Sequence, residues 1–167
     1  IEIILFIILL FYRKKGSLGY IFLYLFALFS GITMGYAIDH YVTILGGIVV
    51  VYAFLGTAII FAVMAKLGWD PNKNLLSWGK WLLIAIVLLV VALIANIFIQ
   101  SAMISLLAGL FGILIFSASI MYELNVMLKV DHYEEDIPNL VLGLYLDFVN
   151  LFLSILRVLG FISSTDD

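Results

Sequence analysis

The sequence predicts an all-α protein, a polytopic bundle of transmembrane helices. Of its 167 residues, 66% are hydrophobic and only 11% are charged, and the mean hydropathy is +1.27. An ordinary soluble domain is about half apolar and about a quarter charged, so a water-soluble fold could not hide this much apolar surface. Charged residues also interrupt the chain at intervals that suit bilayer-spanning helices of about 20 residues.

The uncharged runs give the expected helices in order. The first run, residues 1–12, is too short to cross a hydrocarbon core of about 30 Å at about 1.5 Å per residue. It is therefore interpreted as the second half of a helix. Five complete spans are expected after it. The predicted single transmembrane domain, residues 1–167, has a partial helix at 1–13 and helices at 17–38, 43–66, 78–100, 102–129 and 139–161.

Polar residues mark the expected connections between these helices. Asp39-His40 is expected to form a short turn, and Asp70-Pro71-Asn72 is typical of a loop. The longest uncharged stretch, residues 81–122, is predicted to be two helices broken near Gln100-Ser101. Asn96, four residues before Gln100, is interpreted as part of that helix end.

Basic residues predict the orientation, because cytoplasmic loops carry an excess of lysine and arginine. Seven of the eight fall in alternate connections, which we therefore assign to the cytoplasm: Arg13, Lys14, Lys15, Lys66, Lys73, Lys80 and Lys129. The eighth, Arg157, lies deep in the last helix. It is interpreted either as neutralising the bundle or as capping the helix end.

The last two helices each carry a stripe of small and polar residues at helical spacing. In the last helix the stripe is Gly143, Asp147, Asn150, Ser154 and Arg157. In the helix before it the stripe is Ser105, Gly109, Gly112, Phe116, Ser119 and Glu123. A carboxylate facing lipid costs roughly 2.5 kcal/mol or more at the bilayer centre, so both stripes should face protein or water.

Glu123 is the expected partner of Asp147, because the two residues flank the same loop and can lie at similar depth. Two carboxyl groups in a low-dielectric site cannot both ionise cheaply, but they can share one proton. Such a pair can act as a proton-controlled latch, with Arg13 as a counter-charge. It can also attract calcium, which takes oxygen ligands. Ser119, Asn150, Ser154 and Arg157 are candidate pore-lining residues.

Other interpretations of the same residues remain open. Glu123 can extend along the helix to the cytoplasmic interface, and Asp147 can belong to a purely structural ion pair. The glycines and serines of the stripes also suit close helix packing. The chain contains no cysteine and two histidines, which leaves no thiolate chemistry and no histidine-rich metal centre.

Several segments resemble the Bax inhibitor-1 family of membrane proteins, also called TMBIM or lifeguard, and in particular its bacterial members. They are Ser-Leu-Gly-Tyr (17–20), Phe-Ser-Gly-Ile-Thr (29–33), Gly-Thr-Ala-Ile-Ile-Phe-Ala-Val (56–63) and Leu-Tyr-Leu-Asp-Phe-Val-Asn-Leu-Phe (144–152) with Leu156-Arg157. The resemblance implies seven helices with the last one central, so that this chain lacks the first helix and the start of the second.

The resemblance also implies a pH-sensitive calcium leak gated by two aspartates. One aspartate maps onto Asp147, and the other maps onto Glu123, where this chain departs from the family pattern by one methylene. The arginine that pairs with them maps onto Arg13. Neither an enzyme activity nor a tightly bound cofactor is expected.

The expected function is therefore a calcium leak channel gated by protonation of the Glu123–Asp147 pair. The alternatives are a regulatory membrane protein without transport and an intramembrane aspartyl protease, whose usual motifs fit Tyr122-Glu123 and Leu144–Asp147 poorly. The expected partners are calcium ions, protons and the lipid bilayer, with no nucleic acid. A monomer in a prokaryotic cell membrane is expected.

Overall fold

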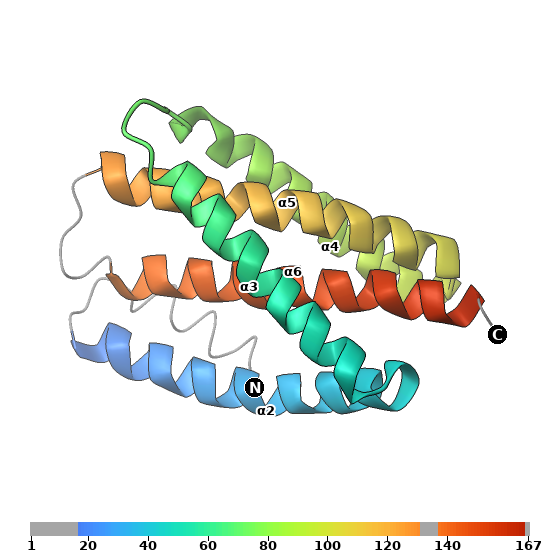
Figure 1. Ribbon diagram of the computed structural model, residues 1–167. Coiled ribbons are helices and arrows are strands. Elements are labelled where there is room, and N and C mark those ends of the chain that lie inside the picture. Colours follow the sequence, from blue (N-terminus) through green and yellow to red (C-terminus); the bar gives the residue numbers. More distant parts are fainter. Residues whose placement is uncertain (1–16, 131–136, 166–167) are drawn as a thin grey trace.

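The computed structural model describes residues 17–130 and 137–165, and these ranges are helical apart from short connections (Figure 1). The elements are α2 (Ser17–Leu45), α3 (Gly47–Gly68), the short 3-10 helix η1 (Leu76–Trp78), α4 (Gly79–Ile99), α5 (Ala102–Lys129) and α6 (Ile137–Thr165). The two described ranges contain no strand. The predicted all-α class is confirmed.

The predicted break between α4 and α5 is confirmed. Gln100 takes a left-handed conformation, with φ 53°, and its backbone N–H donates to the Asn96 carbonyl at 2.8 Å. The Asn96 side-chain oxygen accepts from the Ser101 N–H at 2.9 Å, and the Ser101 hydroxyl caps α5 by accepting from the Ile104 N–H at 3.3 Å. The Asn96 and Ser101 side chains thus satisfy backbone N–H groups at the start of α5.

The predicted turn at Asp39-His40 is wrong, because α2 continues through both residues to Leu45. Both side chains are exposed, so neither forces the helix to end. The break comes instead at Gly46, whose φ of 81° lies in the region that glycine adopts without a steric cost. Asp39 and His40 therefore lie on the surface of a helix, and the turn is at Gly46.

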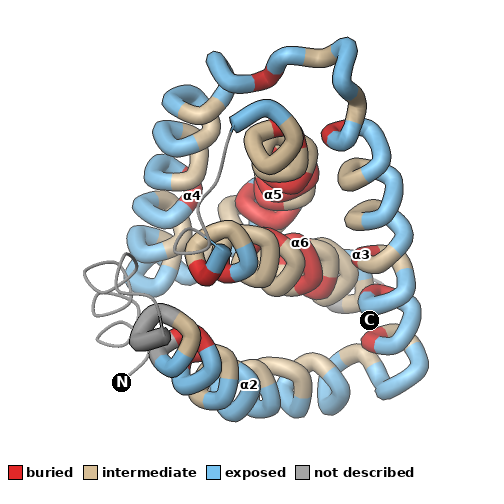
Figure 2. The backbone as a smooth tube through the Cα atoms, turned by 90° about the vertical axis from the view of Figure 1, so that its left-hand side faces the viewer, coloured by how far each residue is buried: buried red, intermediate tan, exposed pale blue. Residues whose placement is uncertain are grey.

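Helices α5 and α6 run antiparallel through the middle of the molecule, with α3, α4 and α2 around them (Figures 1 and 2). Buried residues concentrate on α5 and α6, as the red segments of Figure 2 show. The last helix is central, as expected, and it shares this position with α5. The α3–α4 connection, the end of α5 and the start of α6 meet at one end of the molecule, which we call the basic end after Lys66, Lys73 and Lys129.

The outer surface is apolar, as expected for helices solvated by lipid. Tyr36, Trp81 and Phe98 are 77%, 64% and 84% exposed, a distribution that would be costly in water. Within the described residues, four helical segments are long and apolar enough to cross a bilayer: Gly47–Gly68, Leu76–Ile99, Ala102–Lys129 and Ile137–Ser163. The protein is an integral multi-pass membrane protein. That α2 is a further complete span stays a prediction.

Aromatic rings join α3 to α6. Phe148 of α6 lies edge-to-face between Phe54 and Phe61 of α3, with both pairs of ring centroids 5.7 Å apart. Phe152, one turn along α6, meets Phe54 at 6.0 Å. Edge-to-face pairs at these distances are favourable beyond the apolar area that they bury.

At Gly68, α3 approaches α5 closely. A β-carbon there would lie 3.0 Å from the Cα and carbonyl carbon of Met121 and closer still to its carbonyl oxygen. Because these are backbone atoms, a larger residue must push the two helices apart.

We expect Gly68→Ala to destabilise the protein by about 1–3 kcal/mol, the usual cost of overpacking. For a chain of this size each kcal/mol lowers Tm by about 2–4 °C, which is measurable by thermal unfolding in detergent. Gly56→Ala is the control, because a β-carbon at Gly56 meets nothing within 4 Å. An equal Tm for the two variants would contradict the close approach.

Candidate functional site

The two predicted stripes face each other across the contact between α5 and α6. A β-carbon on Gly112 of α5 would lie 3.0 Å from the Ser154 Cβ of α6, and one on Gly109 would lie 3.1 Å from the Ser154 carbonyl oxygen. The missing side chains therefore let the two backbones approach closely, as small residues do in membrane helix pairs. We call this contact the α5–α6 seam.

The acidic residues lie in the same seam, towards the basic end. The carboxyl group of Glu123 lies against Gly143, where a β-carbon would be 2.6 Å from Oε2 and 2.7 Å from Cδ. The Ser119 side chain lies near the Asp147 carboxyl group. From Gly112 to Glu123 along α5 is eleven residues, and from Ser154 back to Gly143 along α6 is also eleven. The antiparallel register is thus constant along the seam.

Two carboxyl oxygens in the seam are buried without a hydrogen-bond partner among the described residues. They are Oε2 of Glu123 and Oδ2 of Asp147, and the Asp147 side chain is only 5% exposed. The two groups are close enough to repel each other when both are ionised. A buried acceptor left unsatisfied costs about 1–3 kcal/mol, so these atoms mark a place where a proton or a cation would be stabilised.

The register places the two acids one helical turn apart along α6. Glu123 faces Gly143, and Asp147 is four residues further from the basic end. One turn is about 5.4 Å along the axis, so Gly143, which the Glu123 carboxyl group touches, and the backbone of Asp147 differ in level by this amount. The alternative in which Glu123 extends along the surface of α5 to the interface is wrong, because its carboxyl group is turned into the seam.

Cavities follow the polar stripe of α6 beyond the acids. Asn150 lines a cavity of about 230 Å³ beside α2, and it also lines one of about 100 Å³ with Ser154 and Arg157. Arg157 reaches a further cavity of about 280 Å³ that Ser105 also lines. Ser154 is buried, and its hydroxyl donates to the Asn150 carbonyl at 2.7 Å.

Arg157 does not cap the end of α6, since the described helix continues for eight residues beyond it. It lies instead between the 100 Å³ cavity and the 280 Å³ cavity.

The residues that could hold a metal ion are the two carboxylates. The described part of the chain has no group of three or more His, Asp or Glu side chains placed to hold one. Calcium takes about 6–8 oxygen ligands, so most ligands of an ion at Glu123 and Asp147 would have to be water, hydroxyl or backbone oxygens. Such a site suits an ion in transit better than a resident one.

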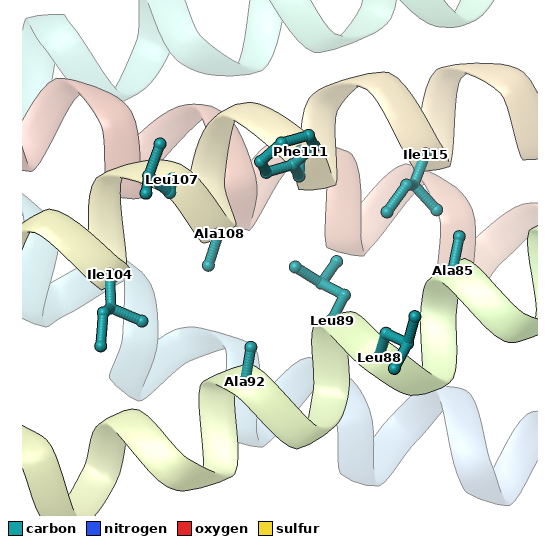
Figure 3. A pocket seen from close by; sticks show the side chains of 9 residues that line it. All are labelled: Ala85, Leu88, Leu89, Ala92, Ile104, Leu107, Ala108, Phe111 and Ile115. Carbon is teal, nitrogen blue, oxygen red and sulfur yellow. The ribbon is translucent and has the colours of Figure 1, made fainter.

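One further cavity is unrelated to this chemistry. It has a volume of about 430 Å³ and lies between α4 and α5, where Leu88, Leu107 and Phe111 open it to the lipid-facing surface (Figure 3). Figure 3 shows only apolar side chains around it. It contains no group that could bind a cation or exchange a proton.

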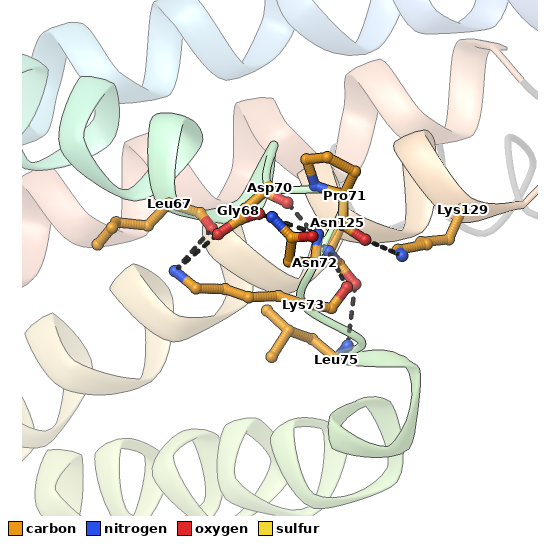
Figure 4. Close-up of polar contacts among 9 residues, drawn as sticks. All are labelled: Leu67, Gly68, Asp70, Pro71, Asn72, Lys73, Leu75, Asn125 and Lys129. Atoms are coloured by element: carbon orange, nitrogen blue, oxygen red, sulfur yellow. Dashed lines mark hydrogen bonds and ion pairs between the residues drawn. The ribbon is translucent and has the colours of Figure 1, made fainter.

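Asn125 is a buried polar residue that the sequence analysis missed. It is fully buried, and its side-chain oxygen accepts from the Leu75 N–H at 2.9 Å. Its amide nitrogen donates to the carbonyl oxygens of Gly68 at 3.0 Å and Lys73 at 3.2 Å (Figure 4). One side chain of α5 thereby fastens the whole α3–α4 connection. The available signal was an amide inside an apolar helix, which calls for a partner.

Charged residues of the α3–α4 connection complete this joint. Lys129 of α5 donates to the Pro71 carbonyl, and Lys73 donates to the Leu67 carbonyl at 3.2 Å (Figure 4). Asp70 pairs with Lys73 at 3.8 Å and accepts from the Asn72 N–H at 2.9 Å. These cations are thus held at the basic end.

The predicted counter-charge Arg13 lies outside the described residues. Residues 131–136, between α5 and α6, also lie outside the described residues. The role of Arg13 stays a prediction.

Comparisons with known proteins identify relatives of this chain. A family model described as Inhibitor of apoptosis-promoting Bax1 matches residues 1–164. An uncharacterized protein of Helicobacter pylori is 33% identical over 99% of this chain and 71% of its own length. One of Campylobacter jejuni is 31% identical over 88% of this chain and 63% of its own length. An uncharacterized membrane protein of Streptococcus pyogenes is 30% identical over 89% of this chain and 66% of its own length. The chain thus spans 63–71% of the length of these relatives.

Proposed function

We propose that this chain, which belongs to the Bax inhibitor-1 family, is a pH-dependent calcium leak channel whose latch is the pair Glu123 and Asp147. The observation that carries the proposal is the pair of buried carboxyl oxygens without hydrogen-bond partners among the described residues, turned into the contact between two central helices. Lone acids inside a membrane bundle are costly, and they characteristically belong to ion or proton pathways.

The latch follows from the chemistry of two neighbouring carboxyl groups. When one is protonated, its hydroxyl can donate to the other and join α5 to α6. When both are ionised, they repel each other in a medium of low dielectric. The two helices then separate at the part of the seam that contains Glu123 and Asp147. Arg13 is proposed as the counter-charge that adjusts this balance.

The proposed path for the ion continues along the stripe of α6. Asn150, Ser154 and Arg157 line successive cavities, so polar groups are available from Asp147 to the far end of the helix. Amide and hydroxyl oxygens can replace part of the hydration shell of calcium. Calcium is therefore proposed as a permeant ion, with protons as the controlling ligand and no tightly bound cofactor.

The sequence motifs disfavour the protease alternative, because Tyr122-Glu123 and Leu144–Asp147 fit the usual motifs of intramembrane aspartyl proteases poorly. We propose a monomer in a prokaryotic cell membrane, with the basic end in the cytoplasm.

The test is calcium entry into liposomes that contain the purified chain and a trapped calcium indicator. We expect entry above that of protein-free liposomes, with a rate that changes with pH. A chain that inserts and stays folded but passes no calcium at any pH would contradict the leak. That result would favour the alternative of a regulatory membrane protein without transport.

A further inference from the structure

Gly143 is the residue on which the Glu123 carboxyl group rests. A β-carbon at this position would lie 2.6 Å from Oε2 and 2.7 Å from Cδ of Glu123, and closer still to Oε1. Real β-carbons essentially never come this close to another heavy atom. The carboxyl group therefore occupies the space that any other residue at 143 would fill with its own side chain.

The atoms that meet this space differ from those at Gly68. At Gly68 the obstacle is the backbone of Met121, which can move only if the helices separate. At Gly143 the obstacle is the end of a flexible side chain. A methyl group at 143 would consequently displace the carboxyl group and leave the helices in place.

The length of the side chain at 123 decides whether it reaches this space. Glutamate carries its carboxyl group one carbon–carbon bond, about 1.5 Å, further from the backbone than aspartate does. An aspartate at 123 would stop short of Gly143 and leave room for a methyl group there. The glutamate and the glycine are thus matched in shape across the seam.

We propose that Gly143 is a positioning residue, which holds the longer side chain of Glu123 in place so that its carboxyl group can work with Asp147. The proposal rests on the proposed function for its transport readout, whereas the match in shape can be tested without transport. The charged group that interacts with Glu123 among the described residues is Asp147.

Three other charged groups near the basic end are engaged elsewhere. Asp70 is paired with Lys73, and Lys129 is bonded to the Pro71 carbonyl. Arg13 lies outside the described residues.

The test is a double-mutant cycle of Gly143→Ala and Glu123→Asp, with Gly56→Ala as the matched control. At the pH where the wild type conducts least calcium, we expect G143A to conduct several-fold more, because the displaced carboxyl group no longer meets Asp147. In the E123D background the same alanine should change conduction little. Tm in detergent should follow the same pattern, with a loss of about 3 °C for G143A in the glutamate background and less in the aspartate background.

Equal effects of alanine in the two backgrounds, on both conduction and Tm, would overturn the proposal. If neither the wild type nor any variant conducts calcium, the proposed function fails. The double-mutant cycle measured by Tm then tests by itself whether Glu123 and Gly143 are matched in shape. If G143A does not fold, E123D/G143A is still expected to fold, and failure of both variants would also overturn the proposal.

Discussion

Replacing Asp147 with asparagine is expected to abolish the pH dependence of calcium entry into proteoliposomes. Asparagine has nearly the same shape as aspartate, so the α5–α6 seam should keep its packing. It cannot ionise, so the repulsion between residues 123 and 147 is absent at every pH. The amide can also donate a hydrogen bond to Glu123, as a protonated acid would. The rates at acid and alkaline pH should therefore become equal.

Asp39→Asn is the control for this variant. It makes the same chemical change at an exposed carboxylate of α2, outside the seam. We expect D39N to retain the pH dependence of the wild type. If D147N also retained it, while inserting and folding normally, Glu123 and Asp147 could not be the latch.

Asn125→Leu is expected to give the largest loss of stability. Leucine would leave the Leu75 N–H and the carbonyl oxygens of Gly68 and Lys73 without their partner. At about 1–3 kcal/mol for each buried group left unsatisfied, the free energy of unfolding should fall by about 3 kcal/mol or more. For a chain of this size that corresponds to roughly 6–12 °C in Tm.

Two further variants sharpen this result. Asn125→Asp keeps the acceptor for Leu75 but removes both amide donors and places a carboxylate against two carbonyl oxygens. It should therefore also lower Tm at neutral pH. Asn72→Ala should have little effect, because Asn72 is exposed and its described hydrogen bond is made by its backbone N–H. Equal Tm values for N125L and N72A would contradict the proposed role of Asn125.

The helices themselves could be predicted from the sequence because hydropathy and charge record which segments lipid can solvate. The helix predicted at 102–129 has the same bounds in the structure. Periodicity also identified the two polar stripes, since it depends only on spacing within one helix. The predicted turn at Asp39-His40 is wrong because exposed polar residues do not end a helix, whereas the positive φ at Gly46 does.

Contacts between helices could not be predicted from the spacing of residues along the sequence. The partners of Asn125 lie 50–57 residues away along the chain, so no local pattern connects them. Glu123 and Asp147 could be paired from their distances to the shared loop, but which residue faces which depends on how α5 and α6 slide along each other. Only the three-dimensional register shows that Glu123 faces Gly143.

The joint at Asn125 also determines which parts of the molecule can move relative to one another. By joining the end of α3 and the α3–α4 connection to α5, it ties the basic end of α5, where Glu123 lies, to that of α3. Asp147 lies on α6, outside this joint. Separation of the two acids therefore shifts α6 against α5 and α3 together, across the ring contacts of Phe148 with Phe54 and Phe61.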